Sequence, residues 1–305
     1  MSRKTKQVVG RIAGIILLAA LFILINRYLT MSDQEASRNV PVPDGIMEVH
    51  FIDVGQGDAI FIETGNHTML IDAGENNKGS LVREYLNNQR ISKLDYVIGT
   101  HPHSDHIGGL DLVLDAFPVD KVFLPDIVHD TKTFEDVLDA LERHQLKITR
   151  PKVKDQYSLG DASFTILAPN SSEYSDLNNY SICIRLTYGN TSFLLVGDAE
   201  KVSENEMLKN GLDLSADVLK LGHHGSAYSS TSKFLDAVKP SFAVICAGED
   251  NSYGHPHAET MEAVLERGIK VYRTDKQGSI VFTTDGQTVS VNQQSYTITE
   301  QDITR

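Results

Sequence analysis

The sequence is poor in cysteine and, beyond its first segment, poor in positive charge. It contains only two cysteines, Cys183 and Cys246, and both lie in apolar, strand-like runs. One disulfide is therefore the most that the chain can form. The alternative is a pair of buried thiols, because cysteine packs like a small hydrophobic residue. The N-terminal segment has no cysteine nearby, which excludes lipidation of a thiol there.

Charge is unevenly distributed along the chain. Residues 1–44 carry a net charge of +3. Because the formal net charge of the whole chain is −13, the remaining residues carry −16. An acidic domain repels phosphate backbones at long range. This composition disfavours tight binding of duplex nucleic acid, and any activity on nucleic acid has to rely on a local cationic device.

The longest apolar run lies near the N-terminus. Ile12 to Asn26 carries no charge and follows a basic start. A helix that spans a membrane needs about 20 residues, and this run reaches that length if Arg11 and Arg27 extend to the two interfaces. We predict a hydrophobic helix in residues 1–30 that anchors the chain in a membrane, with the rest of the chain outside the cytoplasm.

The alternative for this segment is a signal peptide, whose cleavage would release a secreted protein, because a basic start and a short apolar stretch fit that as well. The residues that follow are bulky, and no small-x-small pattern occurs before Ala36. An uncleaved anchor is therefore the favoured interpretation. Residues 31–45, which are polar and include PVPDG, are predicted to form a linker.

Beyond the linker, short β-rich runs alternate with helical patterns, without short-period repeats or low-complexity tracts. The runs that predict strands are 47–54, 59–64, 68–73, 96–100, 121–125, 163–169, 181–189, 191–198, 217–222, 242–247, 270–274, 279–284 and 288–292. The patterns that predict helices are 80–89, 108–117, 133–145, 203–211, 230–239 and 258–268. This mixture predicts an α/β fold in which helices cover the outer faces of two mixed sheets. We expect one domain, residues 46–305.

The densest group of chemically active side chains is the stretch THPHSDHIGG at 100–109. It places His101, His103 and His106 beside Asp105, although the chain has only 11 histidines. On a turn after a strand, residues i and i+2 point to one side, while i+4 and i+5 wrap around to another. The spacing suits two metal ions, with the first two histidines at one ion and Asp105 with His106 at the other. Imidazole and carboxylate ligands fit zinc, manganese or iron.

Two further strand ends offer metal ligands. Asp198 follows the apolar run FLLVG, and His223 and His224 follow VLKLG. Either feature alone is common in turns, but together with HPHSDH they predict that three strand ends meet at one edge of the sheets. A carboxylate such as Asp198 can bridge two cations about 3.5–4 Å apart.

These motifs resemble those of the metallo-β-lactamase superfamily. HPHSDH is similar to its HxHxDH motif, LIDAG to its first aspartate motif and VGD to its bridging-aspartate motif, and the resemblance extends over residues 46–293. Within the superfamily the chain most resembles the C-terminal hydrolase domain of the ComEC family of DNA-uptake proteins. That resemblance rests on FIDVGQGDA, THPHSDHIGG, NNYSICI, LLVGD, LKLGHHGS, YGHPH and YRTDKQGSI. It implies an αββα sandwich with two divalent metal ions, zinc or manganese, at one edge between the sheets.

The resemblance also implies roles for individual residues. The metal ligands that it implies are His101, His103, Asp105, His106, Asp198 and His224. The first two would bind one metal, and the bridging aspartate would bind both. Asp105 is expected to act in catalysis as well. His223 would lie beside the second metal, and Asp72 would orient a ligand histidine from behind, as such carboxylates commonly do.

The chain departs from the many superfamily members that have a further histidine ligand between HxHxDH and the bridging aspartate. The histidines of that interval, His129 and His144, lie around predicted helices, and the matching place holds Asn179 and Ser181. One metal is therefore expected to lack a protein ligand, which leaves room for a substrate oxygen. Asn179 and Ser181 are expected behind the ligands or against the substrate.

Three other residues are candidates for the site. His255, in YGHPH, is expected to act in catalysis by contacting the leaving group or a phosphate oxygen; the alternative is a structural role at the start of the next helix. Asp58, in GQGDA, either faces the site or stabilises its turn. Lys276 is either a surface lysine or a cationic contact for an anionic substrate.

The resemblance implies hydrolysis by a metal-activated water. We expect a phosphodiesterase or nuclease whose substrate is a phosphodiester, as single-stranded DNA, outside the membrane. The alternatives are a phosphorylcholine-esterase-like or small-molecule phosphoesterase, and a non-catalytic anchored subunit of a DNA-uptake or envelope assembly. Intact ligands argue against the last, and the missing histidine argues against lactamase activity. The sequence indicates no particular protein partner.

Overall fold

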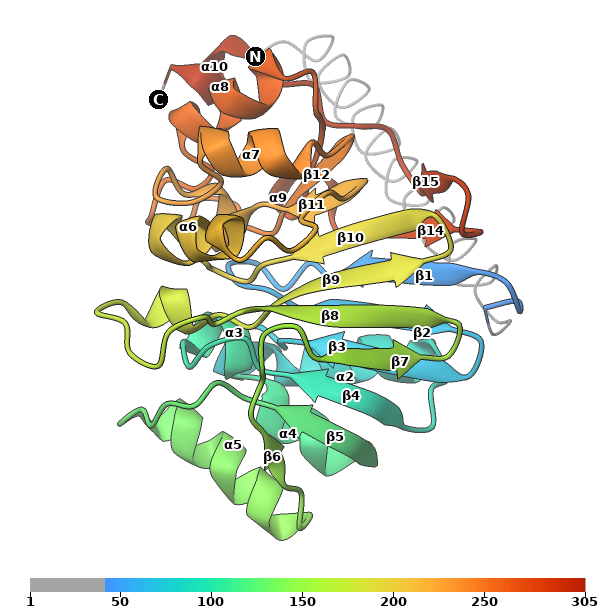
Figure 1. Ribbon diagram of the computed structural model, residues 1–305. Coiled ribbons are helices and arrows are strands. Elements are labelled where there is room, and N and C mark those ends of the chain that lie inside the picture. Colours follow the sequence, from blue (N-terminus) through green and yellow to red (C-terminus); the bar gives the residue numbers. More distant parts are fainter. Residues whose placement is uncertain (1–41, 305) are drawn as a thin grey trace, which may run out of the picture. The chain divides into compact units, whose positions relative to one another are not determined.

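Two β-sheets form the centre of the computed structural model, which describes residues 42–304 (Figure 1). The first sheet has eight strands in the order β15 (Val289–Val291), β14 (Ile280–Thr284), β1 (Met47–Phe51), β2 (Ile60–Thr64), β3 (His67–Ile71), β4 (Leu94–Ile98), β5 (Val119–Phe123) and β6 (Ile148–Thr149). The second has seven in the order β13 (Lys270–Arg273), β12 (Phe242–Ile245), β11 (Val218–Lys220), β10 (Thr191–Leu195), β9 (Cys183–Tyr188), β8 (Ala162–Ala168) and β7 (Gln156–Leu159). Both sheets mix parallel and antiparallel pairs, as the sequence predicts.

Apolar side chains from both sheets fill the space between them. Phe193 of β10 meets Phe282 of β14 edge to face, with ring centroids 6.1 Å apart. Tyr96 of β4 meets Phe164 of β8 in the same way at 5.1 Å. Each such pair stabilises the fold by about 0.5–1.5 kcal/mol beyond the effect of burying its surface. This shared core holds the two sheets face to face.

Helices cover the outer face of each sheet, which completes four layers. The helices α2 (Gly79–Asn88), α4 (Leu110–Ala116) and α5 (Lys132–Arg143) pack on the first sheet, and α6 (Lys201–Lys209), α7 (Ser232–Val238) and α8 (Ala258–Glu266) pack on the second (Figure 1). The apolar spacing of α5 buries Phe134, Val137 and Leu141 on one face. Its first turn is capped by the Thr131 hydroxyl, which accepts the N–H of Phe134. The expected αββα arrangement is confirmed for the described residues.

Short elements link these layers. They are η1 (Asn76–Lys78), α3 (Ser104–Ile107), η2 (Leu177–Tyr180), η3 (Gly222–Gly225), α9 (Thr274–Gln277) and α10 (Glu300–Ile303). The strands β3 to β6 run parallel, and so do β10 to β13. Because the carboxyl ends of parallel strands share one edge of a sheet, the loops after β3, β4, β10 and β11 gather there.

Two predictions from the sequence concern the cysteines and the N-terminal segment. Both thiols, Cys183 and Cys246, are buried and free, so the disulfide alternative is wrong and the alternative of buried thiols holds. The predicted membrane helix at residues 1–30 lies outside the described residues. Within residues 42–304, none of the helices combines the length and the apolar character needed to cross a membrane.

Candidate metal centre

The HPHSDH stretch forms the loop after β4 and the first turn of α3. His101 and His106 are fully buried, whereas His103 and Asp105 are half-buried. The Nε2 atom of His101 lies 2.9 Å from Nδ1 of His103. The glycine pair that follows permits close packing, since a Cβ atom at Gly109 would lie 2.4 Å from the carbonyl oxygen of Ala73. The loop is thereby held against the loop after β3.

Asp198, in the loop after β10, occupies the middle of the histidines. Its Oδ2 atom lies 3.1 Å from Nε2 of His106 and 3.2 Å from Nε2 of His224. The same oxygen lies 4.0 Å from Nε2 of His101. Nε2 of His224 also lies 3.2 Å from the carboxylate of Asp105. The three strand ends that the sequence singles out therefore meet around one carboxylate oxygen.

The two neighbouring histidines after β11 point to different partners. His224 is buried, and its Nδ1–H donates to the carbonyl oxygen of Cys246 at 2.8 Å. This hydrogen bond places the free lone pair of His224 on Nε2, which faces Asp198. His223 instead directs Nδ1 to Glu200 at 3.1 Å, and its Nε2 lies 3.8 Å from Asp198. Both histidines have left-handed backbone conformations, with φ of 49° and 55°, a strained geometry that is typical of functional sites.

Asp72 lies behind the histidines in the loop after β3. Its carboxylate accepts hydrogen bonds from Nδ1 of His106 at 2.8 Å and from the N–H and hydroxyl of Thr100 at 2.8 and 2.7 Å. The Thr100 hydroxyl also lies 3.1 Å from Nδ1 of His101. These contacts orient the Nε2 atoms of both histidines toward Asp198, as expected for a carboxylate behind a metal ligand.

Lys220 is a part of the site that sequence reasoning missed. This last residue of β11 is fully buried, and its Nζ atom lies 2.6 Å from Asp58 and 3.5 Å from Asp198. Nζ also donates to the carbonyl oxygen of Gly197 at 3.0 Å. Burial alone would raise the pKa of Asp58, but the charge of Lys220 and a hydrogen bond from His224 outweigh it and hold that pKa below its usual value. A lysine inside the apolar run VLKLG was the signal for this buried pair.

The residues at the place of the missing histidine support the neighbouring loops. The Ser181 hydroxyl accepts the N–H of Asp198 at 3.0 Å and lies 3.4 Å from Nδ1 of His101. The side-chain oxygen of Asn179 accepts the N–H groups of Glu200 and Ser203 and so fixes the start of α6. His144 lies at the exposed end of α5 and contacts Asp115.

A cavity of about 220 Å³ opens onto this cluster, and His103, Asp105, Asp198 and His255 contribute to its lining. His255 is 8% exposed, and its Nδ1 atom has no hydrogen-bond partner within residues 42–304. Burial and the neighbouring His223 lower the pKa of His255 to about 3. At neutral pH it can therefore offer a ring N–H, but not an imidazolium proton. His257 is the N-cap residue of α8.

The donor set fits a pair of divalent cations. Among the described side chains, the buried Nε2 atoms of His106 and His224 lack hydrogen-bond partners, which is costly unless a ligand takes the lone pair. Two groups bring their ligand atoms within 4.8 Å of one another, His101 with His106 and Asp198, and Asp105 with His106 and His224. If the histidines are neutral, these side chains carry four negative charges and the one positive charge of Lys220. The negative charges belong to Asp58, Asp72, Asp105 and Asp198. Two divalent cations would turn this excess of three negative charges into one positive charge.

Curated proteins include relatives that match most of this chain. The chain is 32% identical over 253 residues to ComE operon protein 3 of Bacillus subtilis (strain 168), a match that covers 77% of this chain and 33% of that protein. It is 29% identical over 274 residues to Competence protein ComA of Neisseria gonorrhoeae, which covers 87% of this chain and 37% of that protein. The chain thus spans about a third of the length of these relatives. The resemblance to ComEC-type competence proteins is confirmed.

Solved structures share the fold at low sequence identity. The metallo-beta-lactamase fold protein YhfI of Bacillus subtilis has a TM-score of 0.55 at 14% identity and covers 78% of this chain and 100% of that chain. CmlA, a diiron beta-hydroxylase from Streptomyces venezuelae, has a TM-score of 0.50 at 16% identity, with 77% and 53% covered. Residues 52–249 match the family described as the Metallo-beta-lactamase superfamily. The chain therefore belongs to the metallo-β-lactamase superfamily.

Proposed function

We propose that the chain is a metal-dependent phosphodiesterase or nuclease that acts on DNA outside the membrane. Its fold implies a metal-dependent hydrolase, and proteins with this fold bind divalent metals, typically two. The observation that carries the proposal is the meeting of His101, His106 and His224 around one oxygen of Asp198, beside a cavity large enough for a phosphate group.

The proposed ligands divide unequally between two metal sites. The first site has His101, His103 and Asp198, and the second has Asp105, His106 and His224 in addition to the same Asp198. The first metal therefore has fewer protein ligands, and we expect it to bind more weakly and to leave positions for substrate oxygens. When bound, the two cations would supply Lewis acidity and activate a water for attack on phosphorus.

The side chains around the metals would position the reactants. Asp105 borders the cavity, and bound cations would favour its ionised form. An ionised carboxylate at this place can accept a hydrogen bond from the attacking water and orient it. His255 is neutral at pH 7 and can donate its ring N–H to a phosphate or leaving-group oxygen.

The charge of the domain makes bound metals necessary for a phosphodiester substrate. The acidic residues of the domain repel nucleic acid, and the metals are the local cationic device that would offset this. DNA as the substrate is supported by the relative from Neisseria gonorrhoeae, which is named as a competence protein. A single strand can place one phosphate in the cavity more easily than a stiff duplex. The anchoring of the domain outside the membrane through residues 1–30 is part of this proposal.

The test is hydrolysis by the full chain, purified in detergent, with zinc or manganese added after chelation. Single-stranded DNA, duplex DNA and an aryl phosphodiester are the substrates, and Asp198→Ala is the control. We expect metal-dependent cleavage of single-stranded DNA and of the aryl diester, and loss of both activities in Asp198→Ala together with bound metal. Hydrolysis of the aryl diester without any DNA cleavage would refute DNA as the substrate and favour a small-molecule phosphoesterase. Full activity of Asp198→Ala would refute the proposed centre.

A further inference from the structure

A second cavity adjoins the metal centre, and we propose that it is a nucleoside subsite, in which Tyr253 stacks on the base attached to the scissile phosphate. The proposal rests on the proposed phosphodiesterase function and specifies its substrate as an unpaired nucleotide. The cavity has a volume of about 420 Å³, which lies within the range of about 300–1,000 Å³ that is usual for small-molecule sites.

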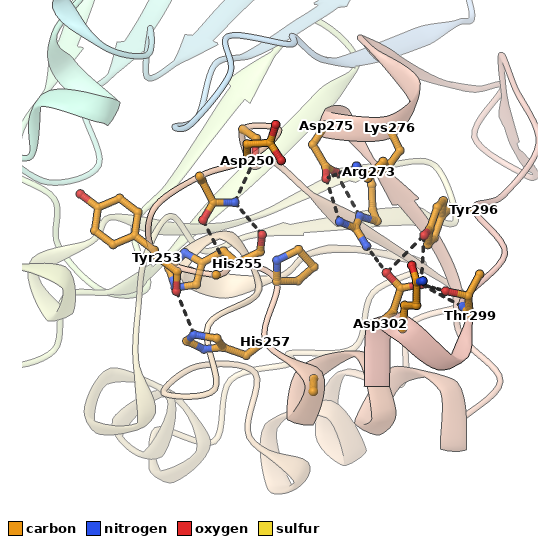
Figure 2. A pocket seen from close by; sticks show the side chains of 16 residues that line it. Asp250, Tyr253, His255, His257, Arg273, Asp275, Lys276, Tyr296, Thr299 and Asp302 are labelled. Atoms are coloured by element: carbon orange, nitrogen blue, oxygen red, sulfur yellow. Dashed lines mark hydrogen bonds and ion pairs between the residues drawn. The ribbon is translucent and has the colours of Figure 1, made fainter. Parts of the chain in front are cut away.

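The two cavities share one wall. Tyr253 and His255 line the metal cavity and also the second cavity. Figure 2 shows these two residues and His257 on one side of the second cavity, and Arg273, Tyr296 and Asp302 on the other. A ligand whose phosphate lies at the metals can therefore extend past Tyr253 into this space without leaving the surface of the protein.

The Tyr253 side chain is exposed but held in position. Its exposed fraction is 64%, and its ring is stacked on that of His255 with centroids 5.6 Å apart and an angle of 20° between the planes. His257 links the Tyr253 backbone to the loop after η3, since one ring nitrogen lies 3.2 Å from the carbonyl oxygen of Tyr253 and the other accepts the N–H of Ala227 at 3.0 Å. An aromatic ring that is fixed and open to solvent beside a phosphodiester site suits a base, because such stacking contributes about 1–3 kcal/mol per base.

The opposite wall favours an uncharged ligand. The Arg273 guanidinium donates to Asp275 at 3.0 and 2.7 Å and to Asp302 at 2.7 Å, and it lies 4.9 Å from the centre of the Tyr296 ring (Figure 2). Lys276 is paired with Glu249 at 3.4 Å. Because both cations of this wall are neutralised by carboxylates, the cavity does not present a second phosphate site. It offers polar groups and aromatic rings, which match the sugar and base of a nucleoside.

The test compares two diesters that share a leaving group and a charge, thymidine 5′-(4-nitrophenyl phosphate) and methyl 4-nitrophenyl phosphate. Stacking of about 1–3 kcal/mol predicts that kcat/KM of the wild type is roughly 5- to 150-fold higher for the thymidine ester. In Tyr253→Ala this ratio should fall close to one, while Tyr253→Phe should keep it. Tyr228→Ala is the matched control, because Tyr228 is a similarly exposed tyrosine at 70% and lines neither cavity. The ratio cancels any general loss of activity.

Binding of thymidine measured without added metal separates the subsite from the chemistry. Saturation-transfer NMR should detect thymidine on the wild type and on Tyr228→Ala, and a clearly weaker signal on Tyr253→Ala. Thymidine binding without hydrolysis of either ester would refute the proposed function but keep the subsite. Equal kcat/KM for the two esters, or an unchanged ratio in Tyr253→Ala, would overturn the subsite. A preference for the 4-nitrophenyl ester of phosphorylcholine over the thymidine ester would overturn it in favour of a quaternary ammonium ligand.

Discussion

Replacing Lys220 with methionine tests whether the buried ion pair behind the metal centre stabilises the fold. Methionine keeps an unbranched apolar stem, one atom shorter than that of lysine, but removes the charge that lies 2.6 Å from Asp58. Asp58 is 1% exposed, so water cannot replace the lost cation. Breaking a buried pair by removing one partner costs about 3–5 kcal/mol, because the other charge stays buried without compensation. At about 2–4 °C per kcal/mol for a domain of this size, the midpoint of thermal unfolding should fall by roughly 6–20 °C.

The measurement is urea and thermal unfolding of wild type, Lys220→Met, Asp58→Asn and the double variant, each with chelator and with metal. The double variant lacks both charges, so it should be more stable than Lys220→Met. The pH dependence gives a second test. In the wild type, the low pKa of Asp58 contributes stability above the pKa of an unfolded aspartate, and this stability is lost as the pH falls through the folded value. In Lys220→Met, burial without the cation raises that pKa, so the cost of the substitution should shrink toward pH 4–5.

Two results would refute this reasoning. A cost below about 1 kcal/mol for Lys220→Met would show that the pair is not a buried, uncompensated interaction of the kind described. A double variant whose loss of stability equals the sum of the two single losses would show that Lys220 and Asp58 act independently.

Three further predictions follow from the geometry. His224→Ala should lose more bound metal than His223→Ala, because the His224 Nε2 atom faces Asp198 and Asp105 whereas His223 binds Glu200; metal analysis showing the reverse order would contradict this assignment. His255→Ala should lower kcat by roughly 10²-fold for good and poor leaving groups alike, as expected for a neutral hydrogen-bond donor, and a loss confined to poor leaving groups would point to proton donation instead. Burial and the nearby Glu48 raise the pKa of Glu63 to about 7, so the wild type should lose stability as the pH rises from about 4.5 through 7. Glu63→Gln should abolish that slope and stabilise the protein by roughly 2–3 kcal/mol at pH 8. An equal free energy of unfolding of the wild type at pH 5 and pH 8 would argue against it.

Local spacing along the sequence is enough to predict the short-range features of this protein. Within HPHSDH the candidate ligands lie within six residues, so the geometry of one loop after a strand places them together. The long helices and most strands are set by apolar periodicity, as in α5, whose buried residues recur along one face. Two strands were missed for the same reason. β6 has only two residues and β7 only four, so the pattern of each is too short to predict a strand before it pairs with its neighbour.

Which residues from distant segments share one environment depends on the tertiary structure. Asp58 and Lys220 pair across 162 positions of the chain, and the packing of two sheets makes that pair fully buried. The choice between His223 and His224 likewise depends on the left-handed turn and on the positions of Glu200 and Cys246. The second cavity arises where the loop that carries Tyr253 faces the segment from Arg273 to Asp302. Spacing along the chain sets geometry only within a turn or an element, whereas burial, ion pairing and cavities depend on which surfaces the folded core brings together.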